Sequence, residues 1–329
     1  MRRRLPTFSP RRVEQLALLA LATLALIVLT GAAVRLSGSG LGCPNWPKCG
    51  KGVVAPLETH AWIEYGNRLA SALVGIVSLV AGFAALRRRP FRRDLAIIGA
   101  LLPLGVLMQG VLGGLTVLFE LKPGFVMGHF MLSMLILCAA VALYWRARHE
   151  PEQLARPTHD RRLVLATRAL LPIAGFAILA GTVATAAGPH AGENEQNEPV
   201  SRLGTFGTLD NVIHWHGRTG TLLGLSAVAV WFLARRWGAG AHLRRALTAL
   251  CVLVAAQGVI GFAQYELELP TEIVWLHILV ATGAWISVLF AVAAAGRLNP
   301  AAEPARPRTG VEPDRPASPV LGSAGPHMR

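Results

Sequence analysis

Apolar residues occur in long runs along this chain, and polar residues gather in the short segments between them. A run of about 20 apolar residues is long enough to cross the hydrocarbon core of a bilayer as a helix. Eight such runs predict eight membrane-spanning helices, at 14–36, 64–86, 94–118, 124–146, 163–186, 212–234, 243–265 and 272–295. The pattern predicts an all-α polytopic membrane protein.

The two ends of the chain differ from the runs between them. The first run follows a basic leader, as a signal peptide does, but it lacks a small-residue cleavage site and continues into a glycine-rich loop. We interpret it as a retained helix. Residues 299–329 are rich in proline, alanine, arginine and serine without an apolar period, which predicts a disordered tail.

Two stretches of the chain resemble each other. Residues 109–130 read QGVLGGLTVLFELKPGFVMGHF, and residues 257–278 read QGVIGFAQYELELPTEIVWLHI. Each begins Gln-Gly-Val and reaches a histidine 20 residues after the glutamine. A duplicated structural unit explains this similarity.

The offset between matching residues is almost constant across four predicted helices. It is 148 for His129 with His277 and for Gln109 with Gln257, and 150 for Arg68 with Arg218 and for Gly31 with Gly181. This indicates two pseudo-symmetric four-helix bundles, with a basic leader before the first and a linker between them; the segments are 1–12, 13–148, 149–162 and 163–298. Because four is an even number, both units enter the bilayer in the same direction, as parallel repeats do.

Charge is sparse and unevenly placed. The chain is 53% hydrophobic and 15% charged, whereas soluble domains carry about 25% charged residues. Of 32 Lys and Arg, 25 lie at the termini and in alternate connections, at 87–93, 146–168 and 235–245. This positive-inside pattern predicts a multi-pass protein of the cell membrane with both termini cytoplasmic. It also accounts for the net charge of +14 without a nucleic-acid partner.

Histidines divide by their depth in the predicted membrane. Five lie at or just inside the outer ends of the even-numbered spans: His60, His129, His214, His216 and His277. The others, which we expect to be solvated, are His149, His159, His190, His242 and His327. Ionisable groups at membrane depth are costly and usually serve a purpose. A single histidine there is more often a hydrogen-bonded core residue, but four helices each carry one at the same depth.

Opposed imidazoles from facing helices can hold haem iron or another metal in a bundle. The Glu-x-x-His pairs of carboxylate di-metal sites and the Cys-x-x-Cys-His signature of covalent haem do not occur in the sequence. Zinc prefers three or four close ligands. The pattern therefore favours non-covalent haem, with one site in each half.

The start of the second span combines several polar residues. In THAWIEYGNRLAS, the side chains of His60, Glu64, Asn67 and Arg68 share one helix face. A glutamate beside a porphyrin can act as an acid or base, and Arg68 and Arg218 could bind haem propionates. Alternatively, Glu64 and Arg68 form an internal ion pair that holds the helix end.

The sixth span contains VIHWHGRTG, with two histidines that are only two residues apart. His214 and His216 project to different sides of a helix, so at most one of them faces a given site.

The four cysteines fall into two groups. Cys138 and Cys251 lie in apolar spans and are interpreted as packing residues. Cys43 and Cys49 flank the turn GCPNWPKCG on the outer, oxidising side, which predicts a disulfide. Its short, exposed loop is also compatible with a labile bond.

Taken together, four motifs resemble the haem A synthase family over residues 15–295: RLSGSGLGCPNWPKC, IEYGNR, QGVLGGLTVL and AGPHAGE. The resemblance is to a bacterial, actinobacterial-like form. It implies eight helices in two halves, with haem near the outer face. It also implies a monooxygenase-like oxidoreductase that converts a ring methyl of haem O to the formyl group of haem A for cytochrome oxidase.

The resemblance also implies residue roles. The second half would hold a b-type haem between His216 and His277. The first half would hold the substrate haem O with His129, and Glu64 would be essential for the reaction. The family's loop cysteines correspond to Cys43 and Cys49.

Two departures from the family pattern matter. The family has Glu-x-x-His-Arg in the second span, where this chain has Asn67 in place of the axial histidine. Either His129 holds the substrate iron alone with an open sixth position, which we favour, or His60 substitutes. In the sixth span a glycine follows His216; the repeat offset pairs His214 with Glu64, so His216 is preferred and His214 is the alternative.

The resemblance implies partners and leaves rival functions open. Haem O synthase would supply the substrate, cytochrome oxidase assembly would use the product, and the membrane electron donor is unidentified. A di-haem electron-transfer cytochrome would need paired histidines in both halves and haems at both faces. A transporter built from parallel repeats would need helices broken at mid-membrane.

Overall fold

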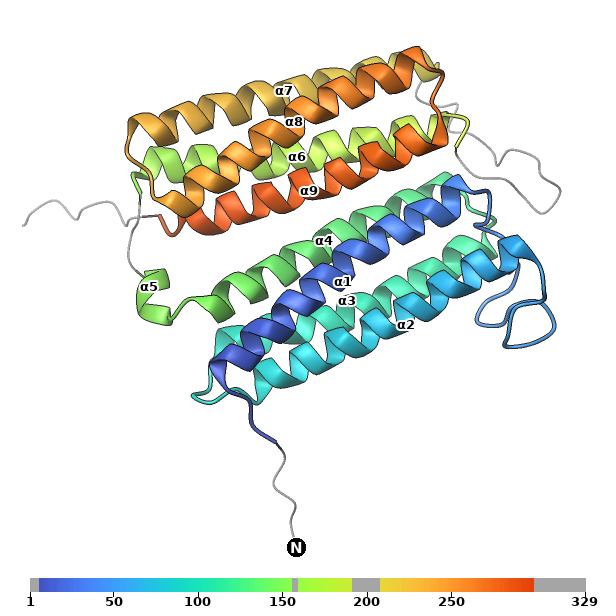
Figure 1. The fold of residues 1–329 in the computed structure, drawn as a ribbon, viewed down its shortest axis with the longest axis horizontal. Helices are drawn as coiled ribbons and strands as arrows, with labels where there is room; N and C mark the ends of the chain where they lie inside the picture. Colours follow the sequence, from blue (N-terminus) through green and yellow to red (C-terminus); the bar gives the residue numbers. More distant parts are fainter. Residues whose placement is uncertain (1–5, 156–158, 191–207, 299–329) are drawn as a thin grey trace, which may run out of the picture. The chain divides into compact units, whose positions relative to one another are not determined.

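A computed structural model describes residues 6–155, 159–190 and 208–298 of the chain. The described residues form nine helices (Figure 1): α1 Pro10–Leu36, α2 Thr59–Leu86, α3 Arg93–Leu118, α4 Pro123–Arg148, α5 Pro151–Ala155, α6 Arg161–Ala187, α7 Leu209–Arg236, α8 Ala241–Glu266 and α9 Thr271–Ala295. All except α5 are long and apolar enough to cross a membrane. The prediction of eight spans in an all-α membrane protein is confirmed.

The helices extend beyond the predicted spans mainly at their polar first turns. Helix α2 begins at Thr59, five residues before the predicted start at 64, and α1 begins at Pro10. Ser9 caps α1, because its side chain accepts a hydrogen bond from the backbone N–H of Arg12. Hydropathy alone misses such turns because their residues are not apolar.

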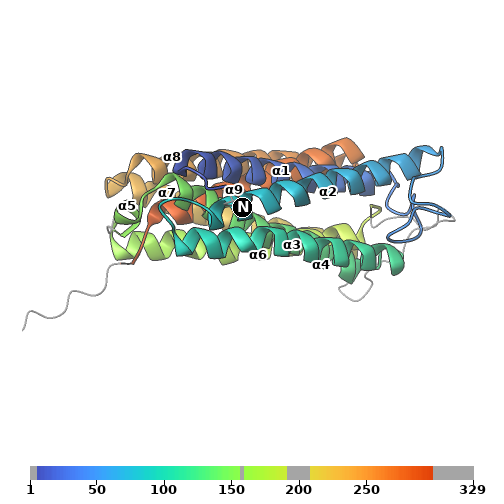
Figure 2. The same cartoon turned by 90° about the horizontal axis from the view of Figure 1, so that it is seen from below.

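The eight long helices form two groups of four. In the first half, α1 contacts α2 and α4, and α3 contacts α2 and α4; in the second half, α6 contacts α7 and α9, and α8 contacts α7 and α9. Figures 1 and 2 show the helices running along one common direction. The halves meet where α9 contacts α1 and α4 and where α4 contacts α6.

Two tryptophans of α9 connect the halves. The indole N–H of Trp275 donates to the carbonyl of Leu29 on α1 at 3.1 Å, and that of Trp285 donates to the carbonyl of Met134 on α4 at 3.0 Å. A buried indole needs such an acceptor. These bonds fix α9 against the first half.

Small residues allow close helix contacts within the first half. A Cβ on Gly82 of α2 would lie 2.6 Å from the backbone oxygen of Gly99 on α3. Membrane helices associate through such small residues because lipid provides no hydrophobic driving force between them.

The turns α3–α4 and α8–α9 share an uncommon conformation. Their positive-φ residues are Glu120 and Leu121 at 51° and 56°, and Glu268 and Leu269 at 60° and 63°. Positive φ is uncommon for residues other than glycine. Its recurrence at an offset of 148 residues supports the predicted duplication.

The two ends of the long helices differ in chemistry. We call the end with His129, His216 and His277 the histidine end. The end where α2, α4 and α7 finish and where α3, α6 and α8 begin is called the basic end. The predicted tail 299–329 lies outside the described residues.

Two histidines at the basic end correct the expectation of solvated side chains. His159 is half-buried: Nδ1 lies 3.1 Å from the carbonyl of Ala295, and Nε2 accepts from the backbone N–H of Gly240 at 3.1 Å. His149 is also half-buried, and its ring centre lies 4.3 Å from that of Trp145.

His190, near the histidine end, was also expected to be solvated, but it is half-buried with Nε2 2.7 Å from the Leu269 carbonyl. The expectation that the His190 side chain is solvated was wrong, as it was for His149 and His159, and the reason is the same. Sequence context gives the depth of a segment but not its tertiary partners. His242 is exposed as expected, and His327 lies outside the described residues.

Candidate functional site

The second half brings two histidines together at the histidine end. The ring centres of His216 on α7 and His277 on α9 are 5.9 Å apart, and the rings are inclined by 67°. His216 Nδ1 lies 3.1 Å from the carbonyl of Ala177 on α6, so Nδ1 carries the proton and donates. Its Nε2 is therefore the nitrogen with a free lone pair, the arrangement found when a backbone carbonyl orients a metal-binding histidine.

Each of these rings lies against a glycine of the preceding helix. A Cβ on Gly181 of α6 would come within 2.9 Å of Cε1 of His216, and one on Gly261 of α8 within 3.5 Å of Cε1 of His277. A larger residue at position 181 would displace the ring. The close approach explains why glycine occupies this point of α6.

The first half has one histidine in the matching position. His129 on α4 lies against Gly113 on α3, where a Cβ would be 3.2 Å from Cε1 of the imidazole. Gln109, the first residue of the repeated stretch, donates from Nε2 to the backbone oxygen of His129 at 3.1 Å. This bond connects α3 to α4 beside the imidazole.

An amide takes the second position in the first half. The nearest atom to a Cβ on Gly31 of α1 would be Nδ2 of Asn67 at 4.0 Å. The hydroxyl of Thr30 donates to Oδ1 of Asn67 at 2.8 Å, which leaves the amide N–H groups free to donate. Because Gly31 matches Gly181, Asn67 has the place that His216 has in the second half.

One of the two tryptophan hydrogen bonds between the halves lies close in sequence to both sites. Trp275 precedes His277 by two residues and donates to Leu29, which directly precedes Thr30. Thr30 in turn donates to Asn67. A change at one site can therefore reach the other through few atoms.

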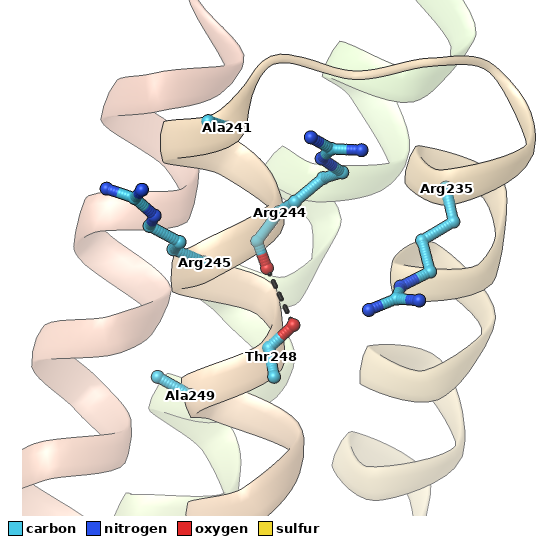
Figure 3. A pocket seen from close by; sticks show the side chains of 6 residues that line it. All are labelled: Arg235, Ala241, Arg244, Arg245, Thr248 and Ala249. Carbon is cyan, nitrogen blue, oxygen red and sulfur yellow. Dashed lines mark hydrogen bonds between the residues drawn. The ribbon is translucent and has the colours of Figure 1, made fainter.

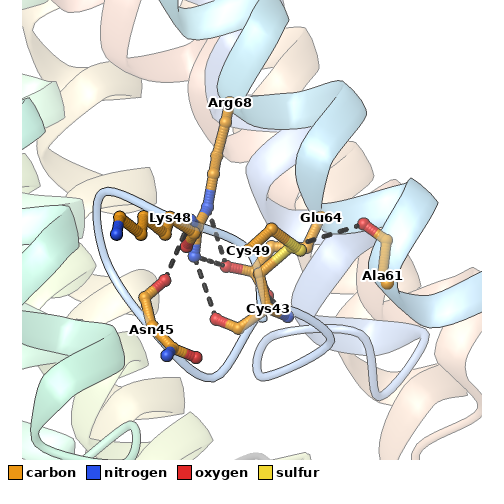
Figure 4. The surroundings of a disulfide bond; sticks show 7 residues. All are labelled: Cys43, Asn45, Lys48, Cys49, Ala61, Glu64 and Arg68. Carbon is orange, nitrogen blue, oxygen red and sulfur yellow. Dashed lines mark hydrogen bonds and ion pairs between the residues drawn. A yellow bond between two sulfur atoms is a disulfide. The ribbon is translucent and has the colours of Figure 1, made fainter. Parts of the chain in front are cut away.

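A loop closed by Cys43 and Cys49 covers the start of α2 (Figure 4). The two Cα atoms are 4.6 Å apart and the sulfurs are bonded, and both residues are buried. Within the loop, the Trp46 ring packs on α3, where a Cβ on Gly114 would lie 2.6 Å from it. The loop therefore spans α2 and α3.

Glu64 and Arg68 hold this loop by hydrogen bonds. Oε1 of Glu64 is paired with Arg68, and Oε2 accepts the backbone N–H of Cys43 at 2.7 Å. The guanidinium also donates to the carbonyls of Cys43, Asn45 and Lys48 at 3.0–3.1 Å. The ion-pair interpretation of these residues thus describes their contacts in the structure. The Glu64 carboxylate is buried and lies three residues before Asn67 on α2.

His60 and His214 lie apart from the paired positions. His60 is exposed, and its Nδ1 is 2.9 Å from the hydroxyl of Ser39. His214 is exposed too, and its Nε2 is 3.5 Å from a carboxylate oxygen of Asp210 on the same helix. Of the two histidines in α7, His216 is the one that faces His277.

Arginines near the histidine end differ in their contacts. Arg218 stacks over the ring of Trp215 with its guanidinium carbon 5.2 Å from the ring centre, and it is exposed. Arg35, in the last turn of α1, is the first residue of the motif RLSGSGLGCPNWPKC, but the sequence analysis gave it no role. Its half-buried side chain has no hydrogen-bond or ion-pair partner among the described residues. The signal available in the sequence was a charge within the last turn of an apolar run.

These side chains fit a haem. Nδ1 of His129 and of His277 is buried and makes no hydrogen bond with the described residues, which is unfavourable for a polar atom unless a bound group orients the ring. Two metal–imidazole bonds of about 2 Å each separate the coordinating nitrogens by about 4 Å. The centres of two such imidazole rings lie farther apart than their coordinating nitrogens do. The 5.9 Å between the ring centres of His216 and His277 agrees with this order.

The residue types narrow the class of group further. No set of three or more His, Cys, Asp or Glu side chains gathers to hold a metal ion in the part of the chain that the structure describes. A porphyrin supplies the equatorial ligands itself and needs only axial imidazoles from the protein. The fold and these sites define a polytopic helical membrane protein with a histidine pair at one end of its second half and a single matching histidine in its first half.

Comparison with known sequences assigns the family. The chain belongs to the COX15-CtaA family of cytochrome oxidase assembly proteins, whose profile matches residues 14–62 and 54–200. It is accordingly a multi-pass protein of the cell membrane with a role in cytochrome oxidase assembly.

Three relatives, each named heme A synthase, show the extent of the similarity. One from Shewanella oneidensis is 27% identical and the match covers 77% of this chain and 87% of the relative. One from Geobacillus thermodenitrificans is 38% identical over 38% of this chain and 41% of the relative. One from Geobacillus kaustophilus is 36% identical over 40% of this chain and 42% of the relative.

Proposed function

We propose that this protein is a haem A synthase, an oxidoreductase that converts a ring methyl of haem O to the formyl group of haem A. The observation that carries the proposal is the inequality of the two sites. One half pairs His216 with His277, as a resident haem requires, whereas the other has Asn67 beside Gly31, the position that matches His216, and a single histidine, His129, beside Gly113. The relatives named heme A synthase support the same function.

In the second half, His216 and His277 would hold a non-covalent b-type haem. When bound, this haem supplies a one-electron redox centre, and its axial ligands tune the reduction potential. The Ala177 carbonyl fixes the tautomer and the orientation of His216. His214, held by Asp210, stays outside this role.

In the first half, His129 would bind the iron of the substrate haem O from one side. An amide is a poor iron ligand, so Asn67 leaves the other side of the substrate accessible to a small molecule. Thr30 fixes the amide so that its N–H groups are free to donate there. His60 is the weaker candidate for a second ligand, because its ring is exposed and bonded to Ser39.

Glu64 would accept protons released at the oxidised carbon. Conversion of a methyl to a formyl group with water as the oxygen source releases protons and electrons. The electrons would leave to the membrane electron carrier, and a buried carboxylate can accept the protons. Arg68 would hold that carboxylate in position through their ion pair. Arg35 and Arg218 are the available cations for the propionates of the two haems, because Arg68 donates all its N–H groups to Glu64 and to the loop.

The remaining partners follow from this role. Haem O synthase would deliver the substrate, and a membrane electron carrier would exchange electrons with the second-half site. Cys43 and Cys49 would form their disulfide on the oxidising side, where it holds the loop above α2.

Haem extraction from the purified full chain tests the proposal. One b haem together with sub-stoichiometric haem O or haem A is the expected result. Two stable b haems would instead identify an electron-transfer cytochrome, and no haem at all would point to a transporter.

The role of Glu64 is tested separately with Glu64→Gln and a matched variant, Arg68→Met. Both remove the buried ion pair and loosen the loop, by about 3 kcal/mol, which amide exchange at Cys43 would report. Only Glu64→Gln should abolish haem A formation while haem binding persists. Equal losses of haem A in both variants would assign Glu64 to loop structure alone.

A further inference from the structure

A cavity lies between α7 and α8 at the basic end of the second half (Figure 3). His216 and His277 lie at the opposite end of the second half. The cavity is open to the surroundings, with a volume of about 790 Å³. Five of its six lining residues are exposed, and the sixth, Thr248, is half-buried; the six are Arg235, Ala241, Arg244, Arg245, Thr248 and Ala249. We call it the arginine cavity. The guanidinium groups of Arg235 and Arg244 lie in the space between α7 and α8, whereas that of Arg245 extends to the other side of α8 (Figure 3). None of the three arginines belongs to the haem sites or to the family motifs.

The side chains around the cavity are held in place by a chain of contacts. Arg235 lies over the ring of Trp231, with its guanidinium carbon 4.4 Å from the ring centre. The indole N–H of Trp231 donates to the hydroxyl of Thr248 at 2.8 Å, and that hydroxyl donates to the backbone oxygen of Arg244 at 2.9 Å. Arg235 is thereby directed towards α8, as Figure 3 shows.

No anion within the described part of the chain neutralises these groups. Arg235, Arg244 and Arg245 form no ion pair and no side-chain hydrogen bond with the described residues. Ala241 begins α8, and its N-cap residue Gly240 offers no side-chain acceptor. The positive end of the helix dipole thus adds to three unpaired charges.

The same end of the first half shows the opposite arrangement. Arg88 is fully buried and pairs with Glu150, with 3.1 Å between Nη2 and Oε1. Arg92 pairs with Asp94 at 2.8 Å and donates to backbone carbonyls of α4 and of the residue after it. The two buried arginines at the basic end of the first half, Arg88 and Arg92, are therefore paired with carboxylates, whereas the exposed arginines of the arginine cavity are not.

Below the arginines, both helices present apolar side chains to the surroundings. On the faces that continue from Arg235 and Arg245, Phe232 is 60% exposed and Val252 is 62% exposed. A cationic cavity at the end of membrane helices, above an exposed apolar surface, matches both parts of a phospholipid. Guanidinium forks bind phosphate in bidentate geometry, and basic sites between helices bind anionic lipid head groups.

We propose that the arginine cavity binds the phosphate-bearing head group of an anionic phospholipid, with its acyl chains along Phe232 and Val252. Phosphate is the chemistry that the guanidinium groups recognise, and the apolar surface selects lipid over a soluble phosphate. The lipid is a ligand of the second half alone.

Native mass spectrometry of the full chain released from detergent tests this proposal, with added phosphatidylglycerol, cardiolipin, phosphatidylcholine or inorganic phosphate. The variant is Arg235→Gln with Arg244→Gln and Arg245→Gln. The control removes three exposed arginines from the same end but outside the cavity: Arg93→Gln with Arg161→Gln and Arg162→Gln.

The wild type and the control should bind the two anionic lipids more tightly than phosphatidylcholine. The cavity variant should lose about tenfold or more of that affinity, with unchanged helix content by circular dichroism. Equal binding by the cavity variant and the control would overturn the proposal. It would be overturned as well if inorganic phosphate occupied the cavity as tightly as the lipids do, which would identify a soluble anion site.

Discussion

The two halves of this protein place different side chains on the same arrangement of helices. In the second half, Gly181 accommodates His216, which faces His277; in the first half, Gly31 faces Asn67, and Gly113 lies against His129. The first half also carries the loop held by Glu64. The two halves thus differ in side chains at matching positions while their helices are arranged alike.

Removal of a paired histidine should give the largest effect. His277→Ala takes one axial ligand from the second-half site, and bound b haem should fall by about tenfold or more. His214→Ala is the matched control, because this histidine lies two residues from His216 but is exposed. Haem content and the absorption spectrum measure both. A loss of haem in His214→Ala equal to that in His277→Ala would reverse the assignment.

Restoration of the missing imidazole tests the difference directly. Asn67→His should give the first half a second axial ligand, and binding of carbon monoxide to the haem there should fall by about tenfold because the open side is closed. Asn67→Ala should keep that binding. If carbon monoxide binds Asn67→His as well as the wild type, Asn67 does not lie on the open side.

The matched glycines offer a smaller change in each half. Gly181→Ala places a Cβ 2.9 Å from the His216 ring, so the ring must move and second-half haem should fall about threefold to tenfold. Gly31→Ala meets Asn67 at 4.0 Å, an ordinary contact, and should be tolerated. The amount of haem bound per protein molecule is measured for both glycine variants and compared with the wild type. Equal sensitivity would mean that the sites are packed alike.

Loss of a bond between the halves should have the smallest effect. Trp275→Phe removes the hydrogen bond to Leu29 and should lower stability by about 1 kcal/mol. Trp285→Phe should be more destabilising, because Trp285 is only 5% exposed and its loss opens a cavity. Thermal denaturation, monitored through the release of haem, compares the stabilities of the two variants. A larger shift for Trp275 would show that this bond dominates the contact between the halves.

Much of this architecture could be predicted from the sequence. Apolar runs identified all eight spans, since a membrane helix must be apolar over its length whatever it packs against. Offsets of 148 and 150 residues indicated the duplication and matched His129 with His277. The repeat offset did not predict that Asn67 takes the place of His216, because an offset of 150 residues aligns Asn67 with Gly217.

Roles that depend on helix rotation and loop path could not be predicted in this way. His214 and His216 are both histidines of the same apolar run, so the run does not say which of them faces inward. The packing of α7 against α6 and α9 turns His216 inward. The sequence likewise left Glu64 and Arg68 open between an acid–base group and an ion pair. The loop from Cys43 to Cys49 returns over α2 and uses both side chains as its anchors.

The sequence by itself determined the membrane setting, the number of spans and the set of ionisable residues at one end, because lipid exposure constrains composition residue by residue. Tertiary structure alone decided which imidazoles face each other and which arginines remain without an anion. Those outcomes depend on contacts between residues far apart in the chain, such as Ala177 with His216 and Arg88 with Glu150. No local pattern encodes such contacts.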